Sequence, residues 1–158
     1  MKQKDTIVIR DAEYSDVDIY YRWVEDPLVR LNSFYSDEIT YKDHVSWYSS
    51  KISDINTFMY IFEINKQFIG QVRIEKKDSL TIGISIDKEF RGQGYGTRII
   101  HLALDRFYKE SKDQSSVFAY IRSNNTASVK VFELAGFSYF KDDKVNGIDC
   151  KVLVFSNK

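Results

Sequence analysis

Residues 80–97 join an alternating apolar run to a glycine-rich turn and the start of an amphipathic helix, which limits the folds open to this chain. In Leu80–Ile86 every second residue is leucine or isoleucine, which predicts a strand with one buried face. Within Arg91–Thr97 glycine then occupies alternate positions. Such a turn directs successive N–H groups into one concavity, and the helix N-terminus behind it adds roughly half a positive charge. The unit therefore predicts a sheet packed against a helix, with an anion site where they meet.

Spacing separates three phosphate-binding motifs that use such a turn. A P-loop needs G-x-x-x-x-G-K-[ST], and no Lys-Ser or Lys-Thr follows Gly96. The dinucleotide fingerprint G-x-G-x-x-G needs its third glycine one position later and an acidic residue at the end of the next strand. Here that strand ends with Tyr120-Ile121-Arg122. The pattern that fits is [RQ]-x-x-G-x-[GA], at Arg91, Gly94 and Gly96.

The rest of the chain predicts an α+β (mixed α/β) domain with a central, mostly antiparallel sheet flanked by helices. Short polar breaks between the central strands indicate hairpin turns, and Gly136 ends the last helix as a left-handed cap. We expect strands at 6–10, 58–64, 68–75, 80–86, 117–121, 137–140 and 150–155, and helices at 14–25, 43–52, 97–109 and 125–135. The order is β-α-α-β-β-β-α-β-α-β-β. The 158 residues contain no repeat and no linker, so 1–158 is expected to form one domain.

Composition and charge argue against several classes of function. The 23 basic and 23 acidic residues balance, whereas nucleic-acid-binding domains carry a basic excess. The apolar runs are too short to span a membrane, and no His or Cys spacing indicates a metal site. Cys150 is the only cysteine, and the N-terminus leads into a strand-like run without an apolar signal region. We therefore expect a cytoplasmic protein with no nucleic-acid, membrane or metal partner; whether it forms a homodimer is left open.

A second motif strengthens the interpretation of the glycine turn. It reads Asn125-x-x-Ser128-x-x-x-Phe132-Glu133-x-x-Gly136-Phe137. Together with Arg91-x-x-Gly94-x-Gly96, it resembles the signatures of the GNAT superfamily of acyl-CoA N-acyltransferases. The likeness covers nearly the whole chain and includes the strand order. It implies a GNAT-like fold that transfers an acetyl group from acetyl-CoA to a primary amine.

The resemblance also implies which residues bind CoA. Backbone amides of Gln93–Thr97 would hold the pyrophosphate, and main-chain groups of Ile84 and Ile86 would pair with the pantetheine arm as an added strand does. Asn125 would contact CoA, or cap the helix that follows it. The full set is Ile84, Ile86, Arg91, Gly92, Gln93, Gly94, Tyr95, Gly96, Thr97, Asn125 and Phe132.

The catalytic residues are less defined. Many family members use a tyrosine as the acid for the departing thiolate, and it corresponds here to Phe132, which has no proton to donate. Tyr120 and Ser128 are candidates for that acid, or CoA leaves as a thiolate, since a thiol has a pKa of about 8–9. For the general base, Tyr120 acting through water competes with Glu75 and Asp87, two carboxylates that we expect to be solvated.

The segment between the first two expected helices bears on the acceptor. Residues 22–34 read R-W-x-x-D-P-x-V-R-x-x-S-F, and H-x-x-W follows. This stretch resembles N-acetyltransferases of bacterial amino-sugar nucleotide pathways, notably the pseudaminic-acid branch. The resemblance implies that Arg30 and His44 contact the diphosphate of a nucleotide-linked amino sugar, while Phe34, Trp47 or Tyr48 contacts its base or sugar. Guanidinium groups match phosphate geometry and aromatic rings stack on planar groups, although each residue also has a structural alternative as core anchor, helix cap or surface ion pair.

Three other functions stay open on the sequence. An N-terminal acetyltransferase for proteins or ribosomal proteins would need an open groove beside 150–155. A polyamine acetyltransferase would need an acidic cleft, which the arginine- and aromatic-rich segment argues against. A non-catalytic acyl-CoA-binding sensor is suggested by the loss of the tyrosine at Phe132.

Overall fold

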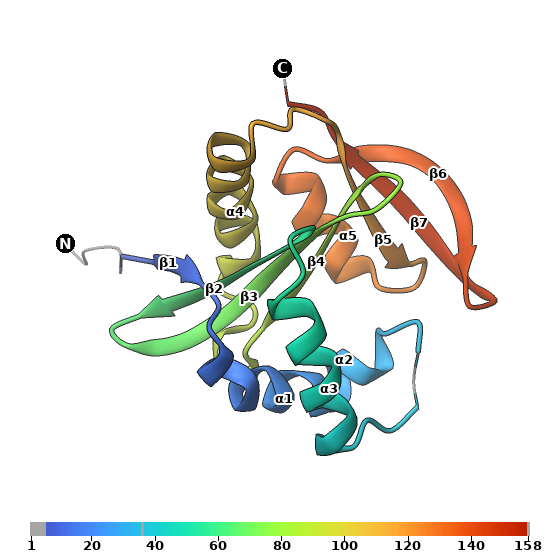
Figure 1. The fold of residues 1–158 in the computed structure, drawn as a ribbon. Helices are drawn as coiled ribbons and strands as arrows, with labels where there is room; N and C mark the ends of the chain where they lie inside the picture. Colours follow the sequence, from blue (N-terminus) through green and yellow to red (C-terminus); the bar gives the residue numbers. More distant parts are fainter. Residues whose placement is uncertain (1–5, 36, 158) are drawn as a thin grey trace.

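A seven-stranded sheet forms the centre of the molecule, with strand order β1-β2-β3-β4-β5-β7-β6 (Figure 1). The computed structural model describes residues 6–35 and 37–157. Neighbouring strands are antiparallel except β4 and β5, which are parallel, and this confirms the predicted α+β fold. The strands are β1 (Val8–Asp11), β2 (Thr57–Ile64), β3 (Gln67–Lys76), β4 (Leu80–Ile86), β5 (Val117–Arg122), β6 (Ser138–Val145) and β7 (Ile148–Phe155).

The helices agree with the predicted ones except at the N-terminal end. They are α1 (Val17–Glu25), α2 (Pro27–Leu31), α3 (Tyr41–Ile52), α4 (Tyr95–Ser111) and α5 (Thr126–Leu134), with 3-10 turns at Tyr14–Asp16 and Lys88–Phe90. The predicted helix 14–25 therefore begins as a 3-10 turn. The short helix α2 was not predicted. It forms because Asp26 accepts a hydrogen bond from the Leu28 N–H and Pro27 supplies a suitable first-turn residue.

The sheet is covered by helices on both faces. Side chains at alternate positions of β2 to β5 form the larger core with α4 and α5, and it includes Phe62, Val72, Ile100 and Phe107. The opposite face of β2 packs against α1 and α3 through a smaller cluster around Tyr20, Trp23 and Tyr48 (the α1–α3 cluster, with Met59 and Ile61). This arrangement follows from the alternation of side chains along a strand, which sends successive residues to opposite layers.

The sheet opens between its two central strands. β4 and β5 are paired only at Leu80–Val117 and Thr81–Phe118, although β4 continues to Ile86 and β5 to Arg122. On their other edges, β4 is paired with β3 along the whole length of β4, and β5 is paired with β7 along the whole length of β5. Figure 1 shows β5, β6 and β7 turned away from the group formed by β1 to β4. The backbone edges of β4 and β5 that face each other beyond this point therefore lack strand partners.

Candidate active site

The glycine turn that precedes α4 is open toward solvent. Gly92 and Gly94 have φ angles of +72° and +83°, a conformation that costs other residues about 1–2 kcal/mol. Gly94 is also the N-cap of α4, and a side chain built at either glycine would meet no atom within 4 Å. The backbone N–H groups of the first helical turn have no partner inside the helix. The turn and the first residues of α4 thus form an open anion cradle, which fits the CoA pyrophosphate.

The free edge of β4 continues from this cradle. The Asp87 N–H donates to the Ile69 carbonyl of β3 at 2.8 Å. Because main-chain groups alternate in direction along a strand, those of Ile84 and Ile86 face the opposite way, toward the unpaired side. The Ile86 carbonyl there accepts from Arg91 Nε, so the two N–H groups and the Ile84 carbonyl are left for an extended ligand that adds to β4 as a further strand. The expectation for these two residues fits this geometry.

The Arg91 side chain connects the turn to the helix α2. Its Nε donates to the Ile86 carbonyl at 3.1 Å, and Nη2 lies 3.0 Å from Asp26 Oδ2. Burial by itself would raise the pKa of Asp26, but the hydrogen bonds from Arg91 and the Leu28 N–H outweigh it and the pKa lies below its ordinary value. The guanidinium thus holds α2 against the end of β4, a role that the sequence did not indicate.

The face of the sheet that carries α1 and α3 changes in character from β2 to β5. On β2 it lies under the α1–α3 cluster. Beyond β2 the side chains on this face are polar on β3, small on β4 and aromatic or basic on β5. We call this part of the face the acceptor face. Its residues are Gln71, Arg73 and Glu75 of β3, Thr81, Gly83 and Ser85 of β4, and Phe118, Tyr120 and Arg122 of β5.

The segment after α2 is fastened to the far side of this face. Arg122 Nε donates to the Ser33 carbonyl at 2.8 Å, and Asn146 Nδ2, at the β6–β7 turn, donates to the Phe34 carbonyl at 2.9 Å. Arg30 donates to the carbonyls of Tyr35 and Asp37, which fixes the curvature of the segment. Residues 26–35, which we call the connector, are therefore tied to both β4 and β5.

A family model described as an acetyltransferase (GNAT) domain matches residues 6–138. The chain belongs to this family. As a GNAT domain it is an acetyl-CoA-dependent N-acetyltransferase, and the glycine turn with the free β4 edge is where its residues fit CoA.

Solved structures with the same fold include acetyltransferases for different amines. A spermidine N-acetyltransferase from Vibrio cholerae, in complex with CoA and spermine, has a TM-score of 0.83 at 19% identity over 95% of each chain. A domain from Methanocaldococcus jannaschii gives 0.83 at 23% identity, over 98% of this chain and 100% of that one. The aminoglycoside acetyltransferase AAC(6')-Ib, in complex with paromomycin and acetyl-CoA, gives 0.82 at 15% identity, over 96% and 94%. At these identities the likeness concerns the fold.

One curated protein sequence is also similar. The uncharacterized protein MJ1062 of Methanocaldococcus jannaschii is 27% identical over 146 residues, which is 89% of this chain. The match spans only 30% of the length of MJ1062.

Two residues predicted to contact the acceptor are buried in this GNAT domain. His44 is 1% exposed, and its Nε2 lies 2.9 Å from the Val17 carbonyl. Tyr48 is fully buried and its hydroxyl donates to the Glu13 carbonyl. These predictions were wrong because the N-terminal helices pack on the sheet through both side chains, which leaves no surface for a ligand. Trp47 is half-buried, and the Arg73 guanidinium lies 4.9 Å from its ring centroid.

The two carboxylates expected to be solvated are also buried. Glu75 is 8% exposed and bonded to Lys51 Nζ at 2.8 Å and Arg73 Nε at 2.6 Å. Asp87 is 2% exposed, accepts from Trp23 Nε1 at 2.9 Å, and pairs with Arg22 at 2.9 Å. Both expectations were wrong, because cationic and indole donors from the helical layer compensate for the burial of these charges. Neither carboxylate is free to act as a base.

The residues suggested for catalysis lie on β5 and α5. Tyr120 is 36% exposed and belongs to the acceptor face. Asn125 caps α5 by accepting from the Ser128 N–H at 3.3 Å, so its capping role is confirmed and its contact with CoA stays a prediction. Phe132 lies in the core with its ring 5.0 Å from that of Phe137. Ser128 is half-buried, one helical turn before Phe132 on the same face of α5.

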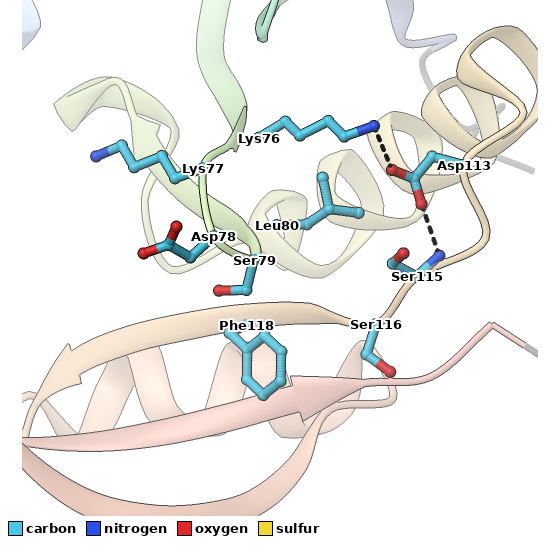
Figure 2. A pocket seen from close by; sticks show the side chains of 9 residues that line it. All are labelled: Lys76, Lys77, Asp78, Ser79, Leu80, Asp113, Ser115, Ser116 and Phe118. Carbon is cyan, nitrogen blue, oxygen red and sulfur yellow. Dashed lines mark hydrogen bonds and ion pairs between the residues drawn. The ribbon is translucent and has the colours of Figure 1, made fainter.

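A pocket at the opposite end of β4 is separate from this site. Figure 2 shows it between the β3–β4 turn and the segment after α4. Its volume is about 190 Å³. Lys76 there pairs with Asp113 at 3.1 Å, and Phe118 lies at its edge. It adjoins the end where β4 and β5 are paired, so it is remote from the free edge. Over residues 6–35 and 37–157 no group of His, Cys, Asp and Glu side chains could hold a metal ion, and no helix there is long and apolar enough to cross a membrane.

Proposed function

We propose that this enzyme acetylates the amino group of a nucleotide-linked amino sugar. The observation that carries the proposal is the fastening of the connector by Arg122 and Asn146. These bonds hold a segment across the ends of β4 and β5 that carries Arg30 and Phe34, a guanidinium for a phosphate and a ring for a planar group. The aminoglycoside acetyltransferase of the same fold supports the proposal in outline, since its acceptor is an amino sugar.

In the proposed reaction the neutral amine attacks the thioester carbonyl, a C–N bond forms and the C–S bond breaks. The amine loses a proton and the departing sulfur gains one. The amine's proton passes to solvent through a water molecule that the Tyr120 hydroxyl holds, because this hydroxyl is exposed on the acceptor face. Ser128 donates toward the sulfur, because it lies one turn from Phe132 on the same face of α5. The alternative, in which CoA leaves as a thiolate, needs no donor.

A specific observation favours a second candidate, a polyamine acceptor. A hollow of about 320 Å³ between the end of α1 and the segment before α3 is lined by Val24, Glu25, Arg30, Glu38 and Ile39. Two carboxylates beside one guanidinium suit a cationic chain. The spermidine N-acetyltransferase of Vibrio cholerae has the same fold.

The decisive experiment measures release of free CoA thiol with acetyl-CoA and a panel of amines. The panel contains UDP- and dTDP-linked 4-amino sugars, spermidine, and peptides with free N-termini. We expect kcat/KM for a sugar nucleotide to exceed that for the other amines by about 10²-fold or more. Turnover of spermidine or peptides with none of sugar nucleotides would reject the proposed acceptor. Tight CoA binding with no thiol release from any amine would reject the acetyltransferase reaction.

The Arg30→Ala variant tests how the acceptor is held. We expect KM for the sugar nucleotide to rise about 10-fold, which corresponds to the loss of one charge-assisted hydrogen bond. KM for acetyl-CoA should stay unchanged. Asn146→Ala is the matched control, because it removes a contact that fastens the connector and leaves the guanidinium in place. Equal effects of the two variants on KM for the sugar nucleotide would mean that Arg30 only shapes the connector.

A further inference from the structure

Gly83 leaves a gap in the middle of β4 that neither backbone conformation nor packing explains. It lies opposite Arg73 in the antiparallel pairing of β3 and β4. A side chain built there would meet no atom within 4 Å, and its φ angle lies outside the left-handed region. A glycine inside a strand weakens the strand by about 0.5–1 kcal/mol relative to alanine. Its presence at an open position indicates that something else approaches the backbone there.

A buried side chain with an unused hydrogen-bonding group lies beside this gap. Gln71 is directly opposite Ser85, and its Nε2 donates to Ser85 Oγ at 3.2 Å. The Gln71 side chain belongs to a residue only 7% exposed, and its Oε1 has no partner among the described residues. A buried polar atom without a partner costs about 1–3 kcal/mol. If the two ends of the amide were exchanged, the nitrogen would be the unpartnered atom, so the imbalance does not depend on their assignment.

The gap is also correctly placed for the reaction. Ser85 lies between Ile84 and Ile86, whose main-chain groups face the free edge where the pantetheine arm fits. Gly83 is the next residue of the acceptor face along β4, and Tyr120 of β5 is on the same face. On the β3 side of the gap, contacts with Trp47 and Glu75 hold the Arg73 side chain away from Gly83. A group lying over Gly83 would therefore be adjacent to the thioester.

We propose that Gly83, Ser85 and Gln71 form the subsite that receives the part of the acceptor that bears the reactive amine. In an amino sugar this part is the ring, which lies on the bare backbone of Gly83, and Ser85 hydrogen-bonds it with the hydroxyl group that Gln71 orients. Gln71 is a positioning residue, and its free amide atom gains a partner when the polar groups of the ring arrive. The inference rests on the proposed function for the kind of ring, a hydroxylated amino sugar, but it concerns acceptor binding by this enzyme in any case.

The Gly83→Val variant tests the shape of the subsite. Valine favours strands and the position is open, so the free energy of unfolding should stay equal or increase. If the ring lies there, kcat/KM for the acceptor should fall about 10²-fold, because displacement by an ångström misaligns the amine, while KM for acetyl-CoA stays unchanged. Thr81→Val is the matched control on the same strand and face, at the end where β4 is paired with β5. An unchanged kcat/KM for Gly83→Val would overturn the inference.

The Gln71→Met variant tests the positioning role separately. Methionine has nearly the same length and no polar atom, so removing an unpartnered atom should leave the protein at least as stable in urea unfolding. We expect KM for the acceptor to rise about 3- to 10-fold, which corresponds to the loss of one hydrogen bond. KM for acetyl-CoA should stay constant. A purely structural Gln71 would instead lower stability and leave KM unchanged, which would also overturn the inference.

Both variants are assayed with UDP-linked 4-amino sugar and with spermidine. If wild-type enzyme acetylates only spermidine, the proposed acceptor fails. The subsite is then tested with spermidine in the same variants: a higher KM than in wild type supports it, and an unchanged KM overturns it. If the sugar nucleotide is acetylated and the variants match wild type, the subsite fails and the proposed function stands. A wild-type enzyme that acetylates neither overturns both.

Discussion

At the scale of single residues, the alternating glycines of the turn serve two distinct purposes. Gly92 and Gly94 are exposed, and their positive φ angles let the chain form the anion cradle. Gly96 is buried and helical, and a side chain there would come within 2.9 Å of Val131 Cγ1. Its role is to let α4 approach α5 closely. The glycine pattern therefore encodes both the anion cradle and the helix contact that supports it.

The Gly96→Ala variant tests this distinction. In an ordinary helix the change stabilises by about 0.5–1 kcal/mol, but here the added methyl collides with a stiff β-branched side chain. We expect Gly96→Ala to lower the free energy of unfolding by about 1–2 kcal/mol.

The control for this variant is the Val131→Ala background, in which the collision is absent. There Gly96→Ala should stabilise the protein. The CoA affinity should change only as far as the folded fraction changes, because the variant removes no backbone contact with CoA. Urea unfolding of the four proteins measures the coupling. A stabilising effect of Gly96→Ala in the wild-type background would contradict the assignment.

At the scale of elements, an ion-pair cluster joins α3 to the sheet. Lys51 of α3 and Arg73 of β3 both bond Glu75, and Lys77 lies 3.7 Å from the same carboxylate. Burial alone would raise the pKa of Glu75, but the hydrogen bond from Lys51 and the charge and hydrogen bond of Arg73 lower it to about 2. The same cluster holds Arg73 against Trp47 and away from Gly83. The packing of α3 thus shapes the acceptor face.

The lowered pKa of Glu75 makes the protein acid-sensitive. The group has a folded-state pKa below the ordinary value of 4.5, so its contribution is complete above about pH 5. That contribution is lost as pH falls from 4.5 toward 2. We expect the free energy of unfolding of wild type to decrease by about 2–3 kcal/mol more over this range than that of Glu75→Gln. Parallel pH profiles for the two proteins in urea unfolding would show that Glu75 is not responsible.

At the scale of the whole molecule, the divided sheet brings the predicted CoA-binding residues and the proposed acceptor region together. Pairing between β4 and β5 ends after Thr81 and Phe118, so the free β4 edge is exposed beside the acceptor face. The connector bridges the division: Arg91 and Asp26 attach it to β4, while Arg122 attaches it to β5. In the proposed function, acetyl-CoA and the amine therefore meet at one strand edge from opposite sides.

Amide hydrogen exchange followed by NMR tests this arrangement. On addition of CoA, exchange at Ile84 and Ile86 should slow by about 10-fold or more, because their N–H groups gain a partner from the pantetheine arm. The amide of Asp87 is the internal control, since it already bonds Ile69 on β3. Protection confined to β6 or β7, or equal at Ile86 and Asp87, would contradict binding along the free edge.

Much of the fold was predictable because its signals are local. Alternation predicted the strands, and Asn125 and Gly136 marked the ends of α5 correctly. The short helix α2 was missed although its signal, Asp26 before Pro27, is present in the sequence. His44, Glu75 and Asp87 were assigned to solvent or substrate because a polar side chain in an isolated sequence carries no sign of its burial. Their burial depends on partners up to 64 residues away, such as Trp23 for Asp87.

The sequence by itself determined the part of the chain that is predicted to bind CoA. The glycine turn and the helix start depend on neighbouring residues, since φ angles and helix capping are set within a few positions along the chain. The proposed acceptor half was decided only by the tertiary structure. Whether Gly83 faces open space, Gln71 lacks a partner and the connector is fastened between β4 and β5 depends on which strands stop pairing and which helices cover them. These are long-range packing outcomes that no local pattern contains.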